Sequence, residues 1–182
     1  MPNLKPAITT VDMALSYRER ILDSVDKKYN FEPLMTLYLT DNMLPDVINV
    51  AAQTESIKAL KYYPAGATTN SDCGVTDIKK IYSVLEAMMK NKLPLLIHGE
   101  VSDIEVNVFD REKVFIEKVL EPLVDDFCEL KIVFEHITTK AAVDFVLNAS
   151  SNVAATITPQ HILLNRNDLF NESFRPHNYC LP

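Results

Sequence analysis

Short apolar runs alternate along this chain with longer segments in which apolar residues recur at helical spacing. Five runs have the length and composition of buried strands, at 34–40, 57–63, 93–97, 131–135 and 153–157. The spacing predicts helices between them, at about 11–25, 47–52, 76–89, 112–127 and 138–148. Thr9 and Thr10 offer capping hydroxyls to the first helix, and Pro122 is expected to kink or end the fourth.

Strands that alternate with helices predict a parallel sheet covered by helices, in the α/β class. An open doubly wound sheet and a barrel share this pattern, but no glycine-rich phosphate loop follows any strand. Polar residues stand at the carboxyl ends of strands (Lys61, His98, His136), where barrels place their active sites. We therefore expect a TIM-type (β/α)8 barrel, as one partial domain over residues 1–182. Five strands and an amino-terminal remnant of a sixth are expected, because eight strands need about 250 residues.

The composition argues against two kinds of partner. The chain has 182 residues and a formal charge of −7 without any basic run, which disfavours a nucleic-acid or anionic-membrane surface. No window approaches the roughly 18 to 20 apolar residues of a membrane span. Cys73, Cys128 and Cys180 are odd in number and widely spaced, which disfavours a disulfide framework. We expect a cytoplasmic protein that acts on a small molecule.

Two histidines occupy equivalent places in the pattern. His98 and His136 each end a different apolar strand, one βα unit apart. In a parallel barrel such positions converge on one mouth, and imidazole nitrogens bind zinc well. A histidine taken alone is more often a hydrogen-bonded structural residue, so both interpretations stay open. His161 and His177 lie in loops after the last strand and are assigned structural roles.

Lys61 is the most informative residue of the pattern. Strand alternation places it in phase with Ile57 and Ala59, facing the barrel interior, whereas Lys58 has the opposite phase and is expected at the surface. A buried ammonium without a partner is costly. Three solutions exist: an ion pair with a carboxylate, a lowered pKa, or conversion to a carbamate that bridges two metals.

Other polar residues near the strand ends also allow two interpretations each. Glu100 and Glu135 flank the two histidines and could orient their imidazoles or form ordinary ion pairs. Thr68, Thr69 and Asn70 form a polar cluster that is either a simple turn or a mobile lid over a ligand. No serine or cysteine has the context of a nucleophile elbow, which argues against covalent acyl chemistry.

Several strings of the sequence resemble one known family. In chain order they are MPNL, KYYPAGATTNSDCGVT, PLLIHGEV, FDRE, FEHITTK, AATITPQH and RPHNYCLP. Together they resemble the single-chain bacterial-type dihydroorotases of the amidohydrolase superfamily, over essentially the whole chain. The resemblance implies a barrel of the metal-dependent hydrolase kind, two zinc ions at its mouth and a homodimer. It also implies the reversible cyclisation of N-carbamoyl-L-aspartate to L-dihydroorotate in pyrimidine biosynthesis.

The resemblance implies a role for each matching residue. By it, Lys61 would be the carboxylated lysine that bridges both zinc ions, and His98 and His136 would complete the more exposed zinc site. The substrate-binding residues would be two loop threonines, a substrate-carboxylate ligand and a residue that contacts the ring through its backbone: Thr68, Thr69, Asn3 and Leu181.

This sequence departs from the family pattern at both ends. An HxH pair and an arginine expected on the first strand would precede Met1, and the general-base aspartate would follow Pro182. We therefore expect no catalytic residue in this chain and little turnover by it alone. The alternatives are a non-catalytic relative with a structural or assembly role and, less compatible with the loop string, a hydantoinase-like amidohydrolase.

Overall fold

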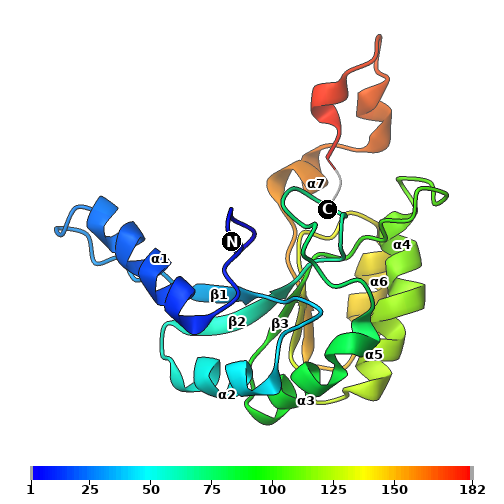
Figure 1. Cartoon of the computed structure of the whole chain (residues 1–182). Coiled ribbons are helices and arrows are strands. Elements are labelled where there is room, and N and C mark those ends of the chain that lie inside the picture. The colour runs from blue at the N-terminus through cyan, green and yellow to red at the C-terminus, as the bar shows by residue number, and fades with distance from the viewer. Residues whose placement is uncertain (1, 181–182) are drawn as a thin grey trace.

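A single parallel sheet organises the chain, for which a computed structural model describes residues 2–180 (Figure 1). Neighbouring strands are also consecutive in sequence, in the order β1-β2-β3-β4-β5. Every pair is parallel. The strands are β1 (Met35–Tyr38), β2 (Ile57–Tyr62), β3 (Leu95–Ile97), β4 (Ile132–Phe134) and β5 (Val153–Ala155). All five predicted strands are thus confirmed, each slightly shorter than its apolar run.

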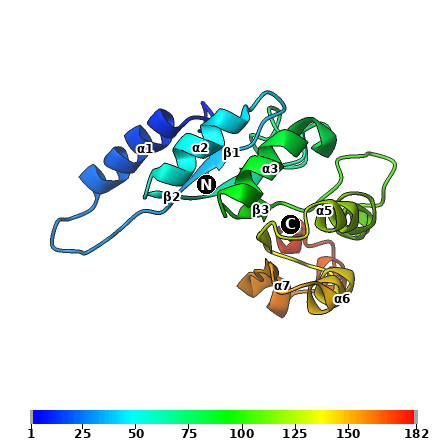
Figure 2. The ribbon, with the colours of Figure 1, turned by 90° about the horizontal axis from the view of Figure 1, so that it is seen from below.

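Helices connect the strands and lie along one side of the sheet. From below, α1, α2, α3, α5 and α6 follow one another in a curved row (Figure 2). The α-helices are α1 (Val11–Ser24), α2 (Pro45–Gln53), α3 (Tyr82–Lys90), α4 (Arg111–Phe115), α5 (Glu121–Asp126), α6 (Lys140–Asn148) and α7 (Pro159–Leu163). The remaining turns are 3₁₀ at Ile78–Ile81, Arg166–Leu169 and Pro176–Asn178, and π-helical at Ile116–Leu120.

The strand order decides between the two folds that share the alternating pattern. A doubly wound sheet reverses its strand order at a switch point and carries helices on both faces. Here the order never reverses and the helices share one face, so the chain is part of a TIM-type barrel, as predicted. The expected amino-terminal strand remnant is wrong. Residues 2–10 form no strand; they are tied to β1 by one hydrogen bond, in which the Tyr38 amide donates to the Ile8 carbonyl.

Three helix boundaries show how local chemistry differs from the periodic pattern. Thr10 is the N-cap of α1, where its hydroxyl accepts from the Met13 amide. The helix expected from residue 76 begins at Ile78, because the Asp77 side chain caps it. Pro122 does not end its helix. It follows the π-helical turn and lies in the first turn of α5, where no backbone donor is required of it.

Side chains alternate between the two faces of β2. Leu60 and Tyr62 belong to the hydrophobic core beneath the helices, whereas Lys61 lies outside that core although it is only 1% exposed. Lys58 is exposed, as predicted. We call the helix-covered side of the sheet the outer face and the opposite side the inner face. No helix among the described residues is long and apolar enough to cross a membrane.

Candidate functional site

The carboxyl ends of β2, β3 and β4 bring three of the predicted site residues together. Lys61 is the fifth residue of β2, while His98 directly follows β3 and His136 follows β4 by two residues. The ring centroids of the two histidines lie 5.1 Å apart. Burial and, after it, the charge of Lys61 lower the pKa of the His136 imidazole. Parallel strand ends meet at one edge, which is why residues 38 positions apart become neighbours.

Lys61 has found a carboxylate partner. Its ammonium forms an ion pair with Glu135, which directly follows β4, and lies 4.9 Å from the ring centroid of Tyr63. Burial lowers the pKa of the Lys61 amine, and the charge and hydrogen bond of Glu135 act against that shift. Two of the three predicted solutions, an ion pair and a lowered pKa, therefore occur together. Of the two interpretations for Glu135, the ion pair is the observed one.

His136 is held as a neutral imidazole. Burial, then the charges of Lys61, His98 and His161, lowers its pKa to about 3. Its Nδ1 is buried and has no hydrogen-bond partner within residues 2–180. Its backbone has a φ of 47°, in the left-handed region that non-glycine residues rarely adopt. Its amide donates to the Thr156 hydroxyl over 2.8 Å, so the neighbouring strand helps to hold this conformation.

His98 is oriented by a carboxylate on its own segment. The imidazole is 3% exposed, and its Nε2 lies 3.3 Å from the Glu100 carboxylate. The other oxygen of Glu100 accepts from Arg111 over 3.4 Å. Gly99 between them has no room for a side chain, because a Cβ there would lie 1.9 Å from the Phe134 ring. Glu100 thus has the imidazole-orienting geometry that was one of its two interpretations.

Tyr63 connects this cluster to the predicted substrate-binding residues. Its ring lies 5.8 Å from that of His98, and its hydroxyl donates to Asn3 Oδ1 over 3.1 Å. The Asn3 amide in turn donates to the Thr69 carbonyl over 3.0 Å. Tyr63 was not singled out from the sequence. The strand alternation that places Lys61 on the inner face also places Tyr63 there, two residues later, so the sequence pattern could have identified Tyr63.

The segment 64–75 is a loop closed by its own hydrogen bonds. Buried Ser71 accepts from the Thr68 amide over 2.9 Å and donates back to the Thr68 carbonyl. Gly74 is required here, because a Cβ would lie 2.5 Å from the Tyr63 carbonyl oxygen. Thr69 is exposed and Thr68 is half-buried. The structure therefore places Thr69 beside Asn3, whereas the hydrogen bonds of Thr68 are made to Ser71 within the loop.

The remaining predicted residues lie at the carboxyl-terminal side. Leu181 is outside the described residues. His161 lies in α7 with its Nδ1 2.8 Å from the Thr158 hydroxyl, and His177 is exposed in the last 3₁₀ turn.

A buried residue that the sequence pattern did not reveal is Glu112, in the first turn of α4. The sequence pattern could not identify it, because a glutamate at this position of an amphipathic helix is usually exposed to solvent.

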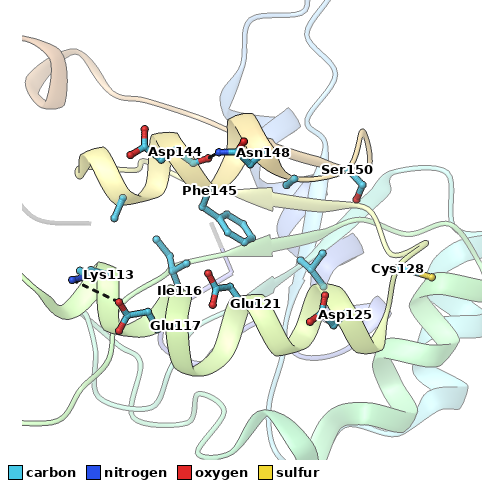
Figure 3. A pocket seen from close by; sticks show the side chains of 13 residues that line it. Lys113, Ile116, Glu117, Glu121, Asp125, Cys128, Asp144, Phe145, Asn148 and Ser150 are labelled. Atoms are coloured by element: carbon cyan, nitrogen blue, oxygen red, sulfur yellow. Dashed lines mark hydrogen bonds and ion pairs between the residues drawn. The ribbon is translucent and has the colours of Figure 1, made fainter.

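A cavity of about 830 Å³ lies away from this cluster, between the α4–α5 segment and α6 (Figure 3). Its apolar floor includes Ile116 and Phe145, and acidic residues such as Glu121 and Asp144 surround it. Neither His98 nor His136 lines it. This cavity is therefore separate from the cluster at the strand ends.

The cluster fits part of a metal site. Two imidazoles side by side, one of them with an unpaired buried nitrogen, are residue types that suit a divalent metal ion such as zinc. Lys61 as an ammonium repels a cation and can ligate only after losing its charge. Within residues 2–180 no three His, Cys, Asp or Glu side chains form a metal-holding group. The described side chains thus supply an incomplete ligand set.

Comparisons with known proteins find relatives named as dihydroorotases. A dihydroorotase from Microcystis aeruginosa is 62% identical over all 182 residues, which cover 53% of its length. Coxiella burnetii has one that is 60% identical, with 52% of its length covered. The chain thus spans about half the length of the curated relatives it matches. No family model matches it.

Solved structures agree with the sequence relatives. The crystal structure of dihydroorotase from Campylobacter jejuni superposes with a TM-score of 0.88 at 39% identity, over 99% of this chain and 51% of that one. Dihydroorotase from Saccharomyces cerevisiae, solved in complex with 5-fluoroorotic acid, gives a TM-score of 0.80 at 38% identity. That match covers 92% of this chain and 50% of the yeast one.

Proposed function

Because this chain is homologous to dihydroorotases along its entire length, we propose that it forms part of a dihydroorotase and supplies half of its active site. The reaction is the reversible cyclisation of N-carbamoyl-L-aspartate to L-dihydroorotate. The carbon–nitrogen bond of the ring forms with loss of water and is hydrolysed in reverse. The observation that carries the proposal is the meeting of Lys61, His98 and His136 at neighbouring strand ends.

The metal in this proposal is zinc, with two ions in a complete site. When bound, the ions would polarise the amide carbonyl and acidify a water molecule. His98 and His136 would hold the more exposed ion. Lys61 would bridge both ions after its neutral amine joins carbon dioxide with loss of one proton. Burial supports that conversion because it favours the uncharged amine, and Glu135 opposes it by stabilising the ammonium.

The substrate side of the proposal involves the loop and its neighbour. Thr68 and Thr69 would close over the substrate, Asn3 would contact its carboxylate, and Leu181 would contribute backbone contacts. The Asn3 amide now donates to the Thr69 carbonyl, so binding would exchange that bond for one to the substrate. The yeast relative was solved with 5-fluoroorotic acid, a cyclic pyrimidine acid, which supports a substrate of this class.

Zinc content and turnover test this proposal directly. Both are measured on the chain as given and on a protein extended at both ends by the flanking coding sequence. We expect two zinc ions and turnover in the extended protein, and little turnover in the 182-residue chain. Lys61→Ala should lower the zinc content and abolish turnover, while Lys58→Ala, exposed on the same strand, should change neither.

One observation favours a second candidate function. The ion pair of Lys61 with Glu135 also satisfies the lysine in a protein that binds no metal. A non-catalytic relative with a structural or assembly role would therefore keep this pair. An extended protein that purifies without zinc and shows no turnover would support that role and overturn the enzymatic proposal.

The proposal includes three further properties. Residues 1–182 form one partial barrel domain, the protein resides in the cytoplasm, and it assembles as a homodimer. Light scattering on the extended protein measures the last of these, and a mass of one chain would contradict it.

A further inference from the structure

Two consecutive residues at the start of α4 reach the two histidine-bearing strand ends. Arg111 and Glu112 belong to the first turn of this helix, which lies on the outer face. Within residues 2–180 neither forms a hydrogen bond or ion pair with His98 or His136. Both belong to the FDRE string that the proposed function leaves without a role. Their side chains diverge, and each meets the segment that follows a different strand.

Glu112 binds the segment that follows His136. The carboxylate is 2% exposed and accepts from the Thr138 amide over 3.0 Å and from the Thr139 amide over 2.8 Å. It also accepts from the Thr139 hydroxyl over 2.6 Å. A buried carboxylate is costly unless its oxygens are satisfied, and here three donors satisfy them. The connection from β4 to α6 is thereby anchored to α4.

This anchor bears on the backbone of His136. The residue has a left-handed φ of 47°, which the chain would relax without restraints on both sides. On one side Thr156 of the β5 end accepts from the His136 amide over 2.8 Å. On the other side the Ile137 amide donates to the Thr156 carbonyl over 2.9 Å, and the next amide, of Thr138, donates to Glu112 over 3.0 Å. Thr156 and Glu112 therefore hold the backbone on the two sides of the segment that carries this imidazole.

Arg111 acts on the other histidine through one intermediate. Its guanidinium donates to Glu100 over 3.4 Å, and Glu100 lies 3.3 Å from His98 Nε2. The Arg111 carbonyl also accepts from the Val101 amide over 3.4 Å. These contacts are longer than those of Glu112, so the link from Arg111 to His98 is weaker than the link from Glu112 to the His136 segment.

We propose that Arg111 and Glu112 are positioning residues, Glu112 for His136 and Arg111, through Glu100, for His98. One helix turn would then set the separation and direction of both imidazoles. The value of this arrangement to the protein rests on the proposed function, because second partners of metal-binding histidines fix their orientation. The positioning itself is a property of the chain without metal.

The NMR signals of the imidazoles distinguish the two positioning roles, because general destabilisation would not affect one histidine more than the other in the expected order. Long-range ¹H–¹⁵N spectra of the ¹⁵N-histidine-labelled chain report its four histidines, each assigned by substitution. Glu112→Gln should move the signals of His136 more than those of His98, and Arg111→Met should reverse that order. Glu117→Gln is the matched control; Glu117 lies on the π-helical turn that follows α4 and forms an exposed ion pair with Lys113 at 3.7 Å. Glu112→Asp keeps the charge and should show a smaller change.

The order of the shifts decides the outcome. Equal shifts of both histidines in both variants, or shifts no larger than in the control, would overturn the positioning roles. If Glu112→Gln fails to fold, Glu112→Asp and Arg111→Met still test the reversal. In the extended protein each variant should weaken zinc binding roughly 10- to 100-fold. If the wild-type extended protein contains no zinc, the proposed function is overturned, but the positioning roles still stand on the histidine shifts. If the protein binds zinc but the shifts do not follow the expected order, the positioning roles are overturned and the proposed function stands.

Discussion

The outer and inner faces of the same five-stranded sheet use their buried residues differently. On the outer face, Leu60 and Phe134 join a continuous apolar core beneath the helices. On the inner face the buried side chains include Tyr38, Lys61 and Tyr63, whose polar atoms each need a partner. Burial on the outer face stabilises the fold, whereas burial on the inner face changes the chemistry of the residues. The following predictions, ordered by their expected effect on stability, test that division.

The largest effect is expected on the outer face. Phe134→Ala removes a fully buried ring that packs 6.3 Å from the ring of Phe115, and should lower the free energy of unfolding by about 3–5 kcal/mol. Urea unfolding of the chain measures it. Phe170→Ala, at a position that is 63% exposed, should cost less than about 0.5 kcal/mol. A similar cost for both would contradict a core confined to the outer face.

The loop beside the inner face should respond next. Gly74→Ala would place a Cβ 2.5 Å from a backbone oxygen, and we expect a loss of roughly 1–3 kcal/mol. Gly66→Ala meets no atom within 4 Å, and its φ of 74° should cost about 1 kcal/mol. Urea unfolding measures the free energy of unfolding of both variants, and protease cleavage of the loop measures its local stability. Equal effects would mean that the loop is not packed against β2.

The pH dependence of stability should reveal the buried imidazole. The pKa of His136 is about 3 when folded against 6.5 for an ordinary histidine, so the unfolded chain binds more protons between these values. The free energy of unfolding therefore falls as the pH drops from 6.5 towards 3. His136→Asn, which tolerates the left-handed backbone, should reduce this slope by up to one proton, and His177→Asn should not. Parallel slopes for all three proteins would contradict a neutral buried His136.

The smallest change in stability is expected at Lys61. Lys61→Met combined with Glu135→Gln removes both charges, and with them the desolvation cost of the ammonium and the ion pair, so the free energy of unfolding should change by less than about 1 kcal/mol. Zinc content of the extended protein should nevertheless fall, which separates stability from function on the inner face. A loss of several kcal/mol would show that the ion pair is needed for folding.

The sequence predicted the repeating part of the fold well. The spacing of apolar residues in a strand or helix follows from which side chains face the core, and this spacing is visible in the sequence. All five strands predicted from it were confirmed. Alternation along β2 correctly separated buried Lys61 from exposed Lys58. Irregular positions were less accessible. The π-helical turn before Pro122 and the absence of a strand in residues 2–10 depend on local hydrogen bonds that periodicity does not encode.

The sequence by itself determined which residue types stand at the strand ends: an inward lysine and two histidines, each one βα unit apart. Only the tertiary structure decided their partners. Lys61 aligns with Leu96, which aligns with Val133, so Glu135 reaches Lys61 across two strand pairings. Glu112 reaches Thr138 because α4 packs beside α6. Such contacts depend on the register and packing of segments distant in sequence, and a local pattern carries no information about either.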